Sequence, residues 1–344
     1  MPLDVSPWCT AVLVSSLAAV GSVVGCGSDG AEGAGDGSTT DTSVGSASAA
    51  ATSASATATT DTDPGGDASS GSTGAGASPR IYGVTLDAIE PLDQIVDALA
   101  QLHHRPTTRI VFDEFVPASD YVDAVVEIAT VSDVMGEILD SYYVAQYSPA
   151  QYRMRAQEYV DAMADTVTIW EVGNEINGEW LCAPDAESCT AAQTADVVEK
   201  MQAAFDVVRA AGGQTALTLY YNEDCWSQPE HEMFTWQADN VPTAMRDGLD
   251  YVFVSYYEDD CNGLQPDWPA VFERLATAFP NARLGIGECG TLDPIAKAAF
   301  VQRYYGMEIE QPAFVGGWFW WYFLEDMVPR DRPLWGVLDQ ALAP

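Results

Sequence analysis

Residues 166–175 read TVTIWEVGNE, a β-branched and aromatic run that ends in an amide and a carboxylic acid. A short apolar run of this kind predicts a buried β-strand, which we place at residues 167–172. The strand would carry Asn174 and Glu175 to its carboxyl end. A second run, RLGIGE at residues 283–288, predicts another buried strand that is followed directly by Glu288. The sequence therefore predicts two carboxyl groups at the ends of two core strands.

From residue 79 onward, short β-branched runs alternate with helical stretches. This alternation is typical of strand–helix units on a parallel sheet. The predicted strands are residues 81–86, 108–112, 134–139, 167–172, 216–221, 251–256, 283–287 and 314–321. The predicted helices are residues 91–102, 121–130, 149–164, 191–211, 230–234 with 243–246, 268–279, 295–308 and 334–342. These units predict a closed (β/α)8 TIM barrel, with an open sheet as the alternative.

In such a barrel the functional groups lie at the carboxyl ends of the strands. Here those positions collect acids, amides and aromatic rings: Asp87, Asp113, Glu114, Asp140, Tyr142, Tyr143, Asn174, Glu175, Asn222, Glu223, Asp224, Trp226, Tyr256, Tyr257, Glu258, Glu288, Trp320, Trp321 and Tyr322. Aromatic rings stack on the apolar faces of sugars, while acids and amides bind sugar hydroxyl groups. Two facing carboxyl groups can cleave a glycosidic bond, because one protonates the leaving oxygen and the other attacks the sugar or stabilises its cation. The sequence thus predicts a carbohydrate cleft with Glu175 and Glu288 as its catalytic pair.

The segments WEVGNE (170–175) and GIGE (285–288) resemble the fourth and seventh strands of the retaining, cellulase-like glycoside hydrolases of clan A. The resemblance covers residues 81–343. It implies that Glu175 is the general acid/base and Glu288 the nucleophile of a double displacement. It also implies that Asn174 binds the 2-hydroxyl group of the sugar in the cleavage subsite.

Other residues match the clan more loosely. The resemblance implies that Arg109 pairs with the nucleophile and that Tyr257 forms a hydrogen bond to it. A tryptophan of the last strand, Trp321 or Trp320, would form the floor of the subsite. Arg109 is equally compatible with a structural role, in which it balances an interior carboxylate. Glu171 lies deeper on the same strand face as Glu175 and is predicted to be a buried structural acid.

Asp140 and Ser255 stand where related enzymes often place histidines, which leaves the family within the clan and its substrate open. We expect Asp140 and Asn222, both at predicted strand ends, to bind substrate. The same residues are compatible with two other functions. One is a catalytically inactive, carbohydrate-binding surface lipoprotein. The other is a transglycosylase, which passes the glycosyl unit to a sugar instead of to water.

The chain carries 51 acidic and 14 basic residues, a formal net charge of −37. A field of this sign repels nucleic acid and anionic polysaccharides. We therefore expect a neutral β-linked polysaccharide or oligosaccharide as substrate and no nucleic-acid partner. The sequence holds no His, Cys and Asp cluster with the spacing of a metal site, so we expect no metal and no cofactor. We also expect the protein to act as a monomer.

The first 78 residues differ in composition from the rest. Residues 1–26 hold an apolar stretch that ends in VVGC and resembles a bacterial lipoprotein signal peptide, which implies cleavage before Cys26 and lipid attachment to its sulfur. The usual positive charge at the start is missing, and a non-lipidated export signal or a short anchor is the alternative. Residues 27–78, rich in Gly, Ser, Ala and Thr, predict a disordered tether. Residues 79–344 would then be the catalytic domain of an exported, membrane-anchored lipoprotein.

Export permits disulfides. Cys182 and Cys189 flank a short loop after the strand predicted at 167–172, and Cys225 and Cys261 follow two other predicted strands. We expect the disulfides Cys182–Cys189 and Cys225–Cys261 on the barrel face that holds the site. Cys289 is left over and is expected to be a small buried residue.

Overall fold

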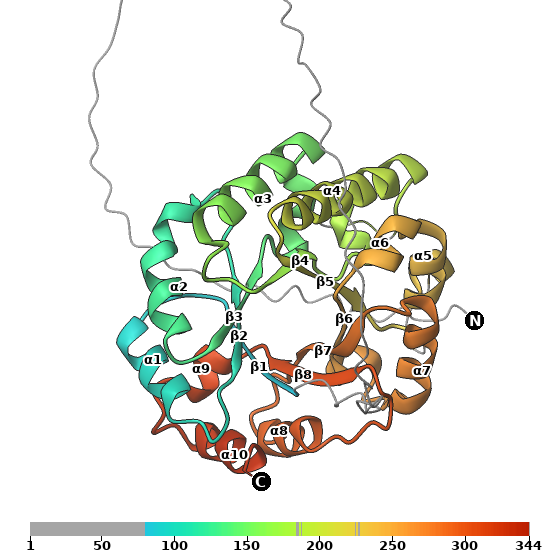
Figure 1. Cartoon of the computed structure of the whole chain (residues 1–344). Helices are drawn as coiled ribbons and strands as arrows, with labels where there is room; N and C mark the ends of the chain where they lie inside the picture. Colours follow the sequence, from blue (N-terminus) through green and yellow to red (C-terminus); the bar gives the residue numbers. More distant parts are fainter. Residues whose placement is uncertain (1–79, 184–185, 187, 224, 226–227, 344) are drawn as a thin grey trace, which may run out of the picture. The chain divides into compact units, whose positions relative to one another are not determined.

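The computed structural model describes residues 80–183, 186, 188–223, 225 and 228–343 (Figure 1). Within these residues, parallel strands close into a barrel in chain order. The strands are β1 (Ile81–Leu86), β2 (Thr107–Val111), β3 (Asp133–Glu137), β4 (Ile169–Gly173), β5 (Gln214–Tyr220), β6 (Tyr251–Tyr256), β7 (Arg283–Cys289) and β8 (Phe314–Trp320). The predicted TIM barrel is confirmed, and the open sheet is excluded because β8 pairs with β1.

Helices surround the strands, as Figure 1 shows. The α-helices are α1 (Leu92–Ala100), α2 (Val122–Ala129), α3 (Pro149–Met163), α4 (Ala191–Ala210), α5 (Met233–Asn240), α6 (Thr243–Gly248), α7 (Trp268–Ala278), α8 (Lys297–Tyr305), α9 (Phe323–Met327) and α10 (Pro333–Ala341). Short 3-10 helices lie in the connections: η1 (Ala118–Asp120), η2 (Ser141–Gln146), η3 (Glu179–Leu181), η4 (Pro229–His231) and η5 (Glu258–Cys261). Each of these 3-10 helices lies in a segment that follows a strand, on the barrel face where the site was expected.

The strand ends differ from the prediction at two places that matter for the site. β4 begins at Ile169 and not at Val167, because the N–H group of Val167 donates to the carbonyl of Met163 and closes the end of α3 (2.9 Å). β7 continues to Cys289, so Glu288 lies inside the strand and not after it. The backbone hydrogen bonds of β7 therefore hold Glu288.

The predicted helix at residues 230–234 is wrong. Residues 229–231 form η4, and α5 begins only at Met233. The carboxylate of Glu232 accepts hydrogen bonds from the N–H groups of Phe234 and Thr235, at 2.9 and 2.8 Å, and caps the start of α5. The five-residue helix α9 was not predicted, because so short a segment shows no helical period.

The barrel interior changes from apolar to polar along the strands. An apolar cluster consists of Met135, Ile169, Ala216, Tyr251, Phe253, Val315 and Phe319. Glu137, Glu171 and Ser255 each follow one of these residues by two positions and therefore face the same side of the sheet. The carboxyl ends of the strands thus rest on a packed apolar base, while the main hydrophobic core lies between the strands and the helices.

Both expected disulfides are present. Cys182–Cys189 closes the loop between η3 and α4, and Cys225–Cys261 joins the loop after β5 to η5. Cys289 is a buried free thiol, as expected. Cys26, with the predicted signal peptide and tether, lies outside the described residues. Among the described residues, none of the helices has both the length and the apolar character needed to cross a membrane.

Candidate active site

The two predicted catalytic acids lie in one neighbourhood, although they come from distant strands. Glu175 directly follows Asn174 at the end of β4, and the Asn174 Nδ2 atom is 3.4 Å from Oε2 of Glu288 on β7. Glu175 in turn accepts a hydrogen bond from Ser255, which is the register partner of Glu288 in the β6–β7 pair. The barrel closure thus brings both carboxyl groups to one polar cluster.

Glu288 is surrounded by hydrogen-bond donors. Arg109 Nη1 donates to its Oε2 atom at 2.8 Å, and the hydroxyl group of Tyr257 donates to its Oε1 atom at 2.6 Å. Asn174 Nδ2 adds a longer contact to Oε2. Burial, and then the charge of Glu288, raise the pKa of Tyr257, so this phenol remains a donor. Donors of this kind bind the ionised form of a carboxyl group.

Glu175 has a different environment. Burial raises its pKa well above the ordinary range, and the charge of Glu288 raises it further. Its two oxygens accept hydrogen bonds from the hydroxyl groups of Ser255 (2.6 Å) and Ser141 (3.1 Å), which act in the opposite direction. Trp180 Nε1 donates to the Ser141 hydroxyl at 3.0 Å. The backbone φ angle of Glu175 is +45°, a conformation that non-glycine residues rarely adopt outside functional sites and turns. The net result is a carboxyl group that holds its proton more tightly than usual.

Arg109 connects Glu288 to two deeper acids. Its guanidinium group is fully buried and binds Glu171 through Nε (2.7 Å) and Nη2 (3.2 Å). Nη2 also lies 2.9 Å from an oxygen of Glu137. Burial raises the pKa of Glu137 well above the ordinary range, against the opposing charge of Arg109 and with the help of Glu171. Arg109 therefore lies against three acids, Glu137, Glu171 and Glu288. Thr218 completes the group with a hydrogen bond to Glu171.

The prediction that Glu171 is a buried structural acid is confirmed. Glu137 was missed. The sequence could have indicated Glu137, since it is an acid inside a predicted strand. In the structure it is the register partner of Glu171. Arg109 therefore fills the structural role that the sequence left open, and it touches Glu288 as well.

Trp321, and not Trp320, presents its ring to the polar cluster. The guanidinium carbon of Arg109 lies 5.5 Å from the centre of the Trp321 ring. Trp320 is fully buried, and its Nε1 atom donates to Asp326 at 3.1 Å. The alternation of side chains along a strand separates the two rings. The same alternation places Tyr256 in the core while Tyr257 reaches Glu288.

Asp140 and Asn222 have different bonding partners. Asp140 caps η2 by accepting a hydrogen bond from the N–H group of Tyr142 at 2.7 Å. Burial raises the pKa of Asp140 to about 6, and the charge of Glu288 adds to the effect. Asn222 is fully buried, and its side chain binds the carbonyl of His231 and the N–H group of Met233. The amide of Asn222 thus holds the connection between β5 and α5, and substrate binding by Asn222 stays a prediction.

A buried His–Asn network supports these loops and was not predicted. His231 is 1% exposed, and its Nδ1 atom lies 2.8 Å from the carbonyl oxygen of Asn177. Its Nε2 atom accepts a hydrogen bond from the N–H group of Cys189, which assigns the proton to Nδ1. The side-chain amide of Asn177 donates a hydrogen bond to the carbonyl of Tyr220 and accepts one from the N–H group of Tyr220. This network links the segments that follow β4 and β5.

Two acids at the rim of the barrel form ion pairs with arginines. Glu223 forms an ion pair with Arg274 at 2.7 Å. Glu258 is buried and pairs with Arg303 and the hydroxyl group of Tyr304. Asp224 and Trp226 lie outside the described residues. Asp140 acts on the pKa of Glu175, and Glu137 and Glu171 share Arg109 with Glu288.

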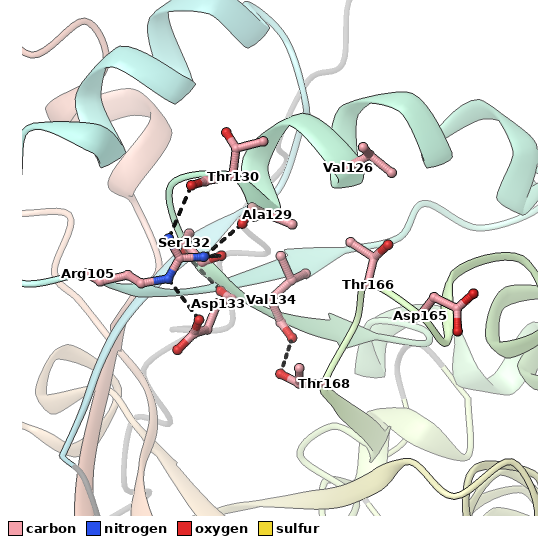
Figure 2. A pocket seen from close by; sticks show the side chains of 10 residues that line it. All are labelled: Arg105, Val126, Ala129, Thr130, Ser132, Asp133, Val134, Asp165, Thr166 and Thr168. Carbon is pink, nitrogen blue, oxygen red and sulfur yellow. Dashed lines mark hydrogen bonds and ion pairs between the residues drawn. The ribbon is translucent and has the colours of Figure 1, made fainter.

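A separate groove lies at the opposite end of the barrel, where β3 and β4 begin. Its lining includes Arg105, Ser132, Asp133 and Thr168, and its volume is ≈ 430 Å³. Figure 2 shows the guanidinium group of Arg105 bonded to Asp133 and to three backbone carbonyls. These contacts occupy the guanidinium group of Arg105, and the groove lies away from the carboxyl ends of the strands. Among the described residues, no group of three or more His, Cys, Asp or Glu residues is arranged to hold a metal ion.

No protein-family model and no curated protein matches the sequence. Solved structures do match the fold. Saccharomyces cerevisiae Gas2p in complex with laminaripentaose superposes with a TM-score of 0.50 and 15% identity, over 78% of this chain and 65% of that chain. An endo-1,4-β-xylanase from Caldicellulosiruptor owensensis reaches a TM-score of 0.47 at 14% identity, over 71% of this chain and 85% of that chain. A family 1 β-glucosidase from Thermotoga maritima reaches 0.46 at 12% identity, over 67% and 76%.

The chain covers only 65% of the length of Gas2p. The likeness to Gas2p shows a shared barrel fold, in agreement with the closed strand order. At 15% identity this likeness shows only that the fold is shared, so an activity must be inferred from the residues of this chain.

Proposed function

We propose that the protein is a retaining glycoside hydrolase that cleaves a β-linked, neutral polysaccharide or oligosaccharide. The observation that carries the proposal is the contrast between two neighbouring carboxyl groups. Glu288 receives hydrogen bonds from Arg109 and Tyr257, whereas burial and the charge of Glu288 raise the pKa of Glu175. One ionised and one protonated carboxyl group is the pair that a double displacement requires.

In the first step, an oxygen of Glu288 attacks the anomeric carbon while the proton of Glu175 passes to the leaving oxygen. The glycosidic bond breaks and a glycosyl ester on Glu288 forms. The charge of Glu288 is now lost, so the largest of the neighbouring charges that raise the pKa of Glu175 disappears. Glu175 then accepts a proton from water, which attacks the ester and restores Glu288. Because the charge of Glu288 raises the pKa of Glu175, Glu175 is suited to act as an acid in the first step and as a base in the second.

The remaining residues take supporting roles in the proposal. Asn174, which contacts Glu288, is placed to bind the 2-hydroxyl group of the sugar being cleaved. Trp321, beside Arg109, offers a ring on which that sugar can stack. Asp140 can accept a hydrogen bond from a sugar hydroxyl group beyond its contact with Tyr142.

The proposed preference for neutral substrates rests on the charges around the pair. Asp140 and Glu175 lie close to Glu288, and the charge of Arg109 is already shared among three acids. A uronate or sulfate would have to lose water beside these acids, while the guanidinium group of Arg109 is already bound to carboxyl groups. Initial rates on neutral and acidic β-glycans at low salt test this point. Faster cleavage of acidic chains would reject the preference.

Replacement of each acid tests the assignment of roles. Glu288→Ala should abolish turnover on every substrate. Glu175→Ala should lose about 10²- to 10⁴-fold on natural glycans and far less on aryl glycosides with activated leaving groups, which need little protonation. Azide should restore the rate of Glu175→Ala on aryl glycosides by replacing water as the nucleophile. Equal losses on both substrate types would contradict the role of Glu175.

The same assays separate the alternatives. Wild-type protein that binds neutral β-glycans without turnover would be a carbohydrate-binding protein on an inactive barrel. Products longer than the substrate would identify a transglycosylase. In a retaining enzyme, a crystal structure should place the carboxyl groups of Glu175 and Glu288 about 5–5.5 Å apart. A separation of roughly 6.5–9.5 Å would indicate inversion.

We extend the proposal to an exported lipoprotein that acts as a monomer. The two disulfides are compatible with an oxidising compartment. Labelling with radioactive palmitate in a bacterial host should mark the wild-type protein and not Cys26→Ala. Equal labelling of both proteins would reject lipid attachment at Cys26, and the sedimentation coefficient of residues 79–344 tests the monomer.

A further inference from the structure

Phe115, in the loop between β2 and η1, combines two unfavourable features. Its side chain is 65% exposed to solvent, although it is one of the large apolar residues. Its backbone φ angle is +60°, in the left-handed region that disfavours bulky side chains. Each feature costs free energy, so the surrounding structure must hold the loop in this form.

The contacts of the loop show how it is held. The N–H group of Phe115 donates to the hydroxyl group of Tyr147 at 2.7 Å, and the two rings stack with centres 5.0 Å apart and planes 11° apart. The buried Arg155 donates to the carbonyl groups of Asp113 (2.7 Å) and Val116 (3.4 Å), on either side of Phe115. The hydroxyl group of Tyr121 also binds Asp113. It accepts a hydrogen bond from the N–H group of Asp113 and donates one to the Asp113 carboxylate.

These bonds fix one face of the Phe115 ring against Tyr147 and leave the other side to solvent. If the exposed ring of Phe115 had no function, the loop would gain stability by turning the ring inward or by relaxing its backbone. The geometry is that of a rigid aromatic platform.

The platform is continuous with the proposed catalytic site. Tyr147 follows η2 directly, and η2 begins with Ser141, which bonds Glu175. Between them, Tyr142 is 49% exposed and forms an edge-to-face pair with Tyr143. The hydrogen bond and the ring stack between Phe115 and Tyr147 join the two loops. The loop of Phe115 is therefore bonded through Tyr147 to the end of the segment whose first residue, Ser141, bonds Glu175.

We propose that Phe115, stacked on Tyr147, is a sugar-binding subsite for a neutral β-glycan, outside the subsite where the bond is cleaved. The inference rests on the proposed function, because it uses Glu175 as the reference point of the cleft. The C–H face of a pyranose ring packs on an exposed aromatic face, and the neighbouring Asp113 and Glu114 can accept bonds from its hydroxyl groups. The consequence is a preference for longer chains.

Phe115→Asn gives the sharpest test, because asparagine tolerates the left-handed backbone and lacks the ring. We expect its melting temperature to equal or exceed that of the wild type. The measured quantity is the ratio of kcat/KM for a neutral β-gluco-hexasaccharide to kcat/KM for the matching aryl monoglycoside. This ratio should fall about 3- to 10-fold, mainly through KM on the hexasaccharide. Phe115→Tyr should restore the ratio, since it keeps the ring.

Met154→Ala is the matched control, because Met154 is 64% exposed on the outer helix α3. It should leave the ratio at the wild-type value. An unchanged ratio in Phe115→Asn, or a loss shared equally by both substrates, would overturn the subsite. A change in sedimentation of Phe115→Asn without a change in the ratio would assign the ring to a contact between protein copies and would likewise overturn it.

The test also separates this inference from the proposed function. If wild-type protein turns over none of a panel of neutral β-glycans that includes these substrates, the proposed function fails, and calorimetric titration with the hexasaccharide replaces the rate measurement. Binding that weakens about 3- to 10-fold in Phe115→Asn would support the subsite on a non-catalytic barrel. Absent binding, or equal binding by both proteins, would reject it.

Discussion

The carboxyl groups of Glu175 and Glu288 differ in their bonding partners more than in their burial. Glu288 contacts a cation and a phenol, whereas Glu175 contacts the serine hydroxyl groups of Ser255 and Ser141. A hydroxyl group is a weaker partner for a charge than a guanidinium group, so burial and the charge of Glu288 outweigh the two serines. The proposed acid and nucleophile are thus distinguished by single side chains around them.

Ser255→Ala should move the pH dependence of the reaction. The Ser255 hydroxyl lowers the pKa of Glu175, so its removal raises that pKa further. The acid form then persists to higher pH, and the basic limb of the kcat/KM profile should shift upward in pH. Ser255→Thr, which keeps a hydroxyl group, should stay close to the wild-type profile. An unmoved basic limb in Ser255→Ala would mean that this limb does not report Glu175.

Among the secondary-structure elements, α3 positions two loops near the site, because it carries Arg155. The Arg155 guanidinium group donates to the carbonyls of Phe112 and Asp113, after β2, and of Ile138, after β3. It also packs over Tyr159, with 4.5 Å to the ring centre. One helix side chain thereby sets the paths of the two loops that carry Phe115 and η2.

Arg155→Met should lower the free energy of unfolding by about 3 kcal/mol, because the carbonyls lose a charged donor while the aliphatic stem is kept. Arg153→Met on the same helix is the control. Arg153 forms an exposed pair with Asp206, at 3.6 Å, and the loss of this pair should cost under about 0.5 kcal/mol. Urea unfolding curves measure both values. Similar costs for the two variants would show that the loops do not depend on Arg155.

For the whole molecule, the excess of acids makes pH the main external control on stability. The net charge is −37, and burial raises the pKa of several carboxyl groups. The pKa values of Asp140 (about 6), Glu179 (about 7) and Glu325 (about 7) are raised by burial first, and those of Asp140 and Glu325 also by neighbouring acids. Such groups bind protons more tightly in the folded state than in the unfolded chain.

Stability should therefore fall as the pH rises from about 4 to about 7. A raised carboxyl pKa contributes stability below the unfolded value, and this contribution is lost as the pH passes through the folded value. Urea unfolding at intervals between pH 4.5 and 8 measures the trend. Glu325→Gln should flatten it, because burial and the charge of Asp87 no longer act on an ionisable group at this position. Stability that increases across this range would contradict the prediction.

Much of the molecule could be predicted because its signals are local. The period of apolar residues predicted the eight strands within about two residues at each end, and strand order with short connections left few alternatives to a barrel. Strand ends in a barrel form one rim, so Asn174, Glu175, Tyr257 and Glu288 could be grouped before any coordinates. The disulfides followed from cysteines placed in loops on that rim.

The tertiary structure decided what depends on contacts between distant segments. The sharing of Arg109 among Glu137, Glu171 and Glu288 requires the barrel to bring together four strands, β2, β3, β4 and β7, and a pattern along the sequence does not show this. Asn222 and Trp320 occupy the same kind of position as their site-facing neighbours, yet packing turned both into the protein interior. The left-handed backbone of Phe115 exists only because Tyr147 and Arg155 hold its loop. The local pattern of the sequence determined the strands and helices and their order. Long-range hydrogen bonds and burial determined which side chains can take part in the proposed chemistry. The reason is that only folding removes these side chains from water and brings their partners within reach.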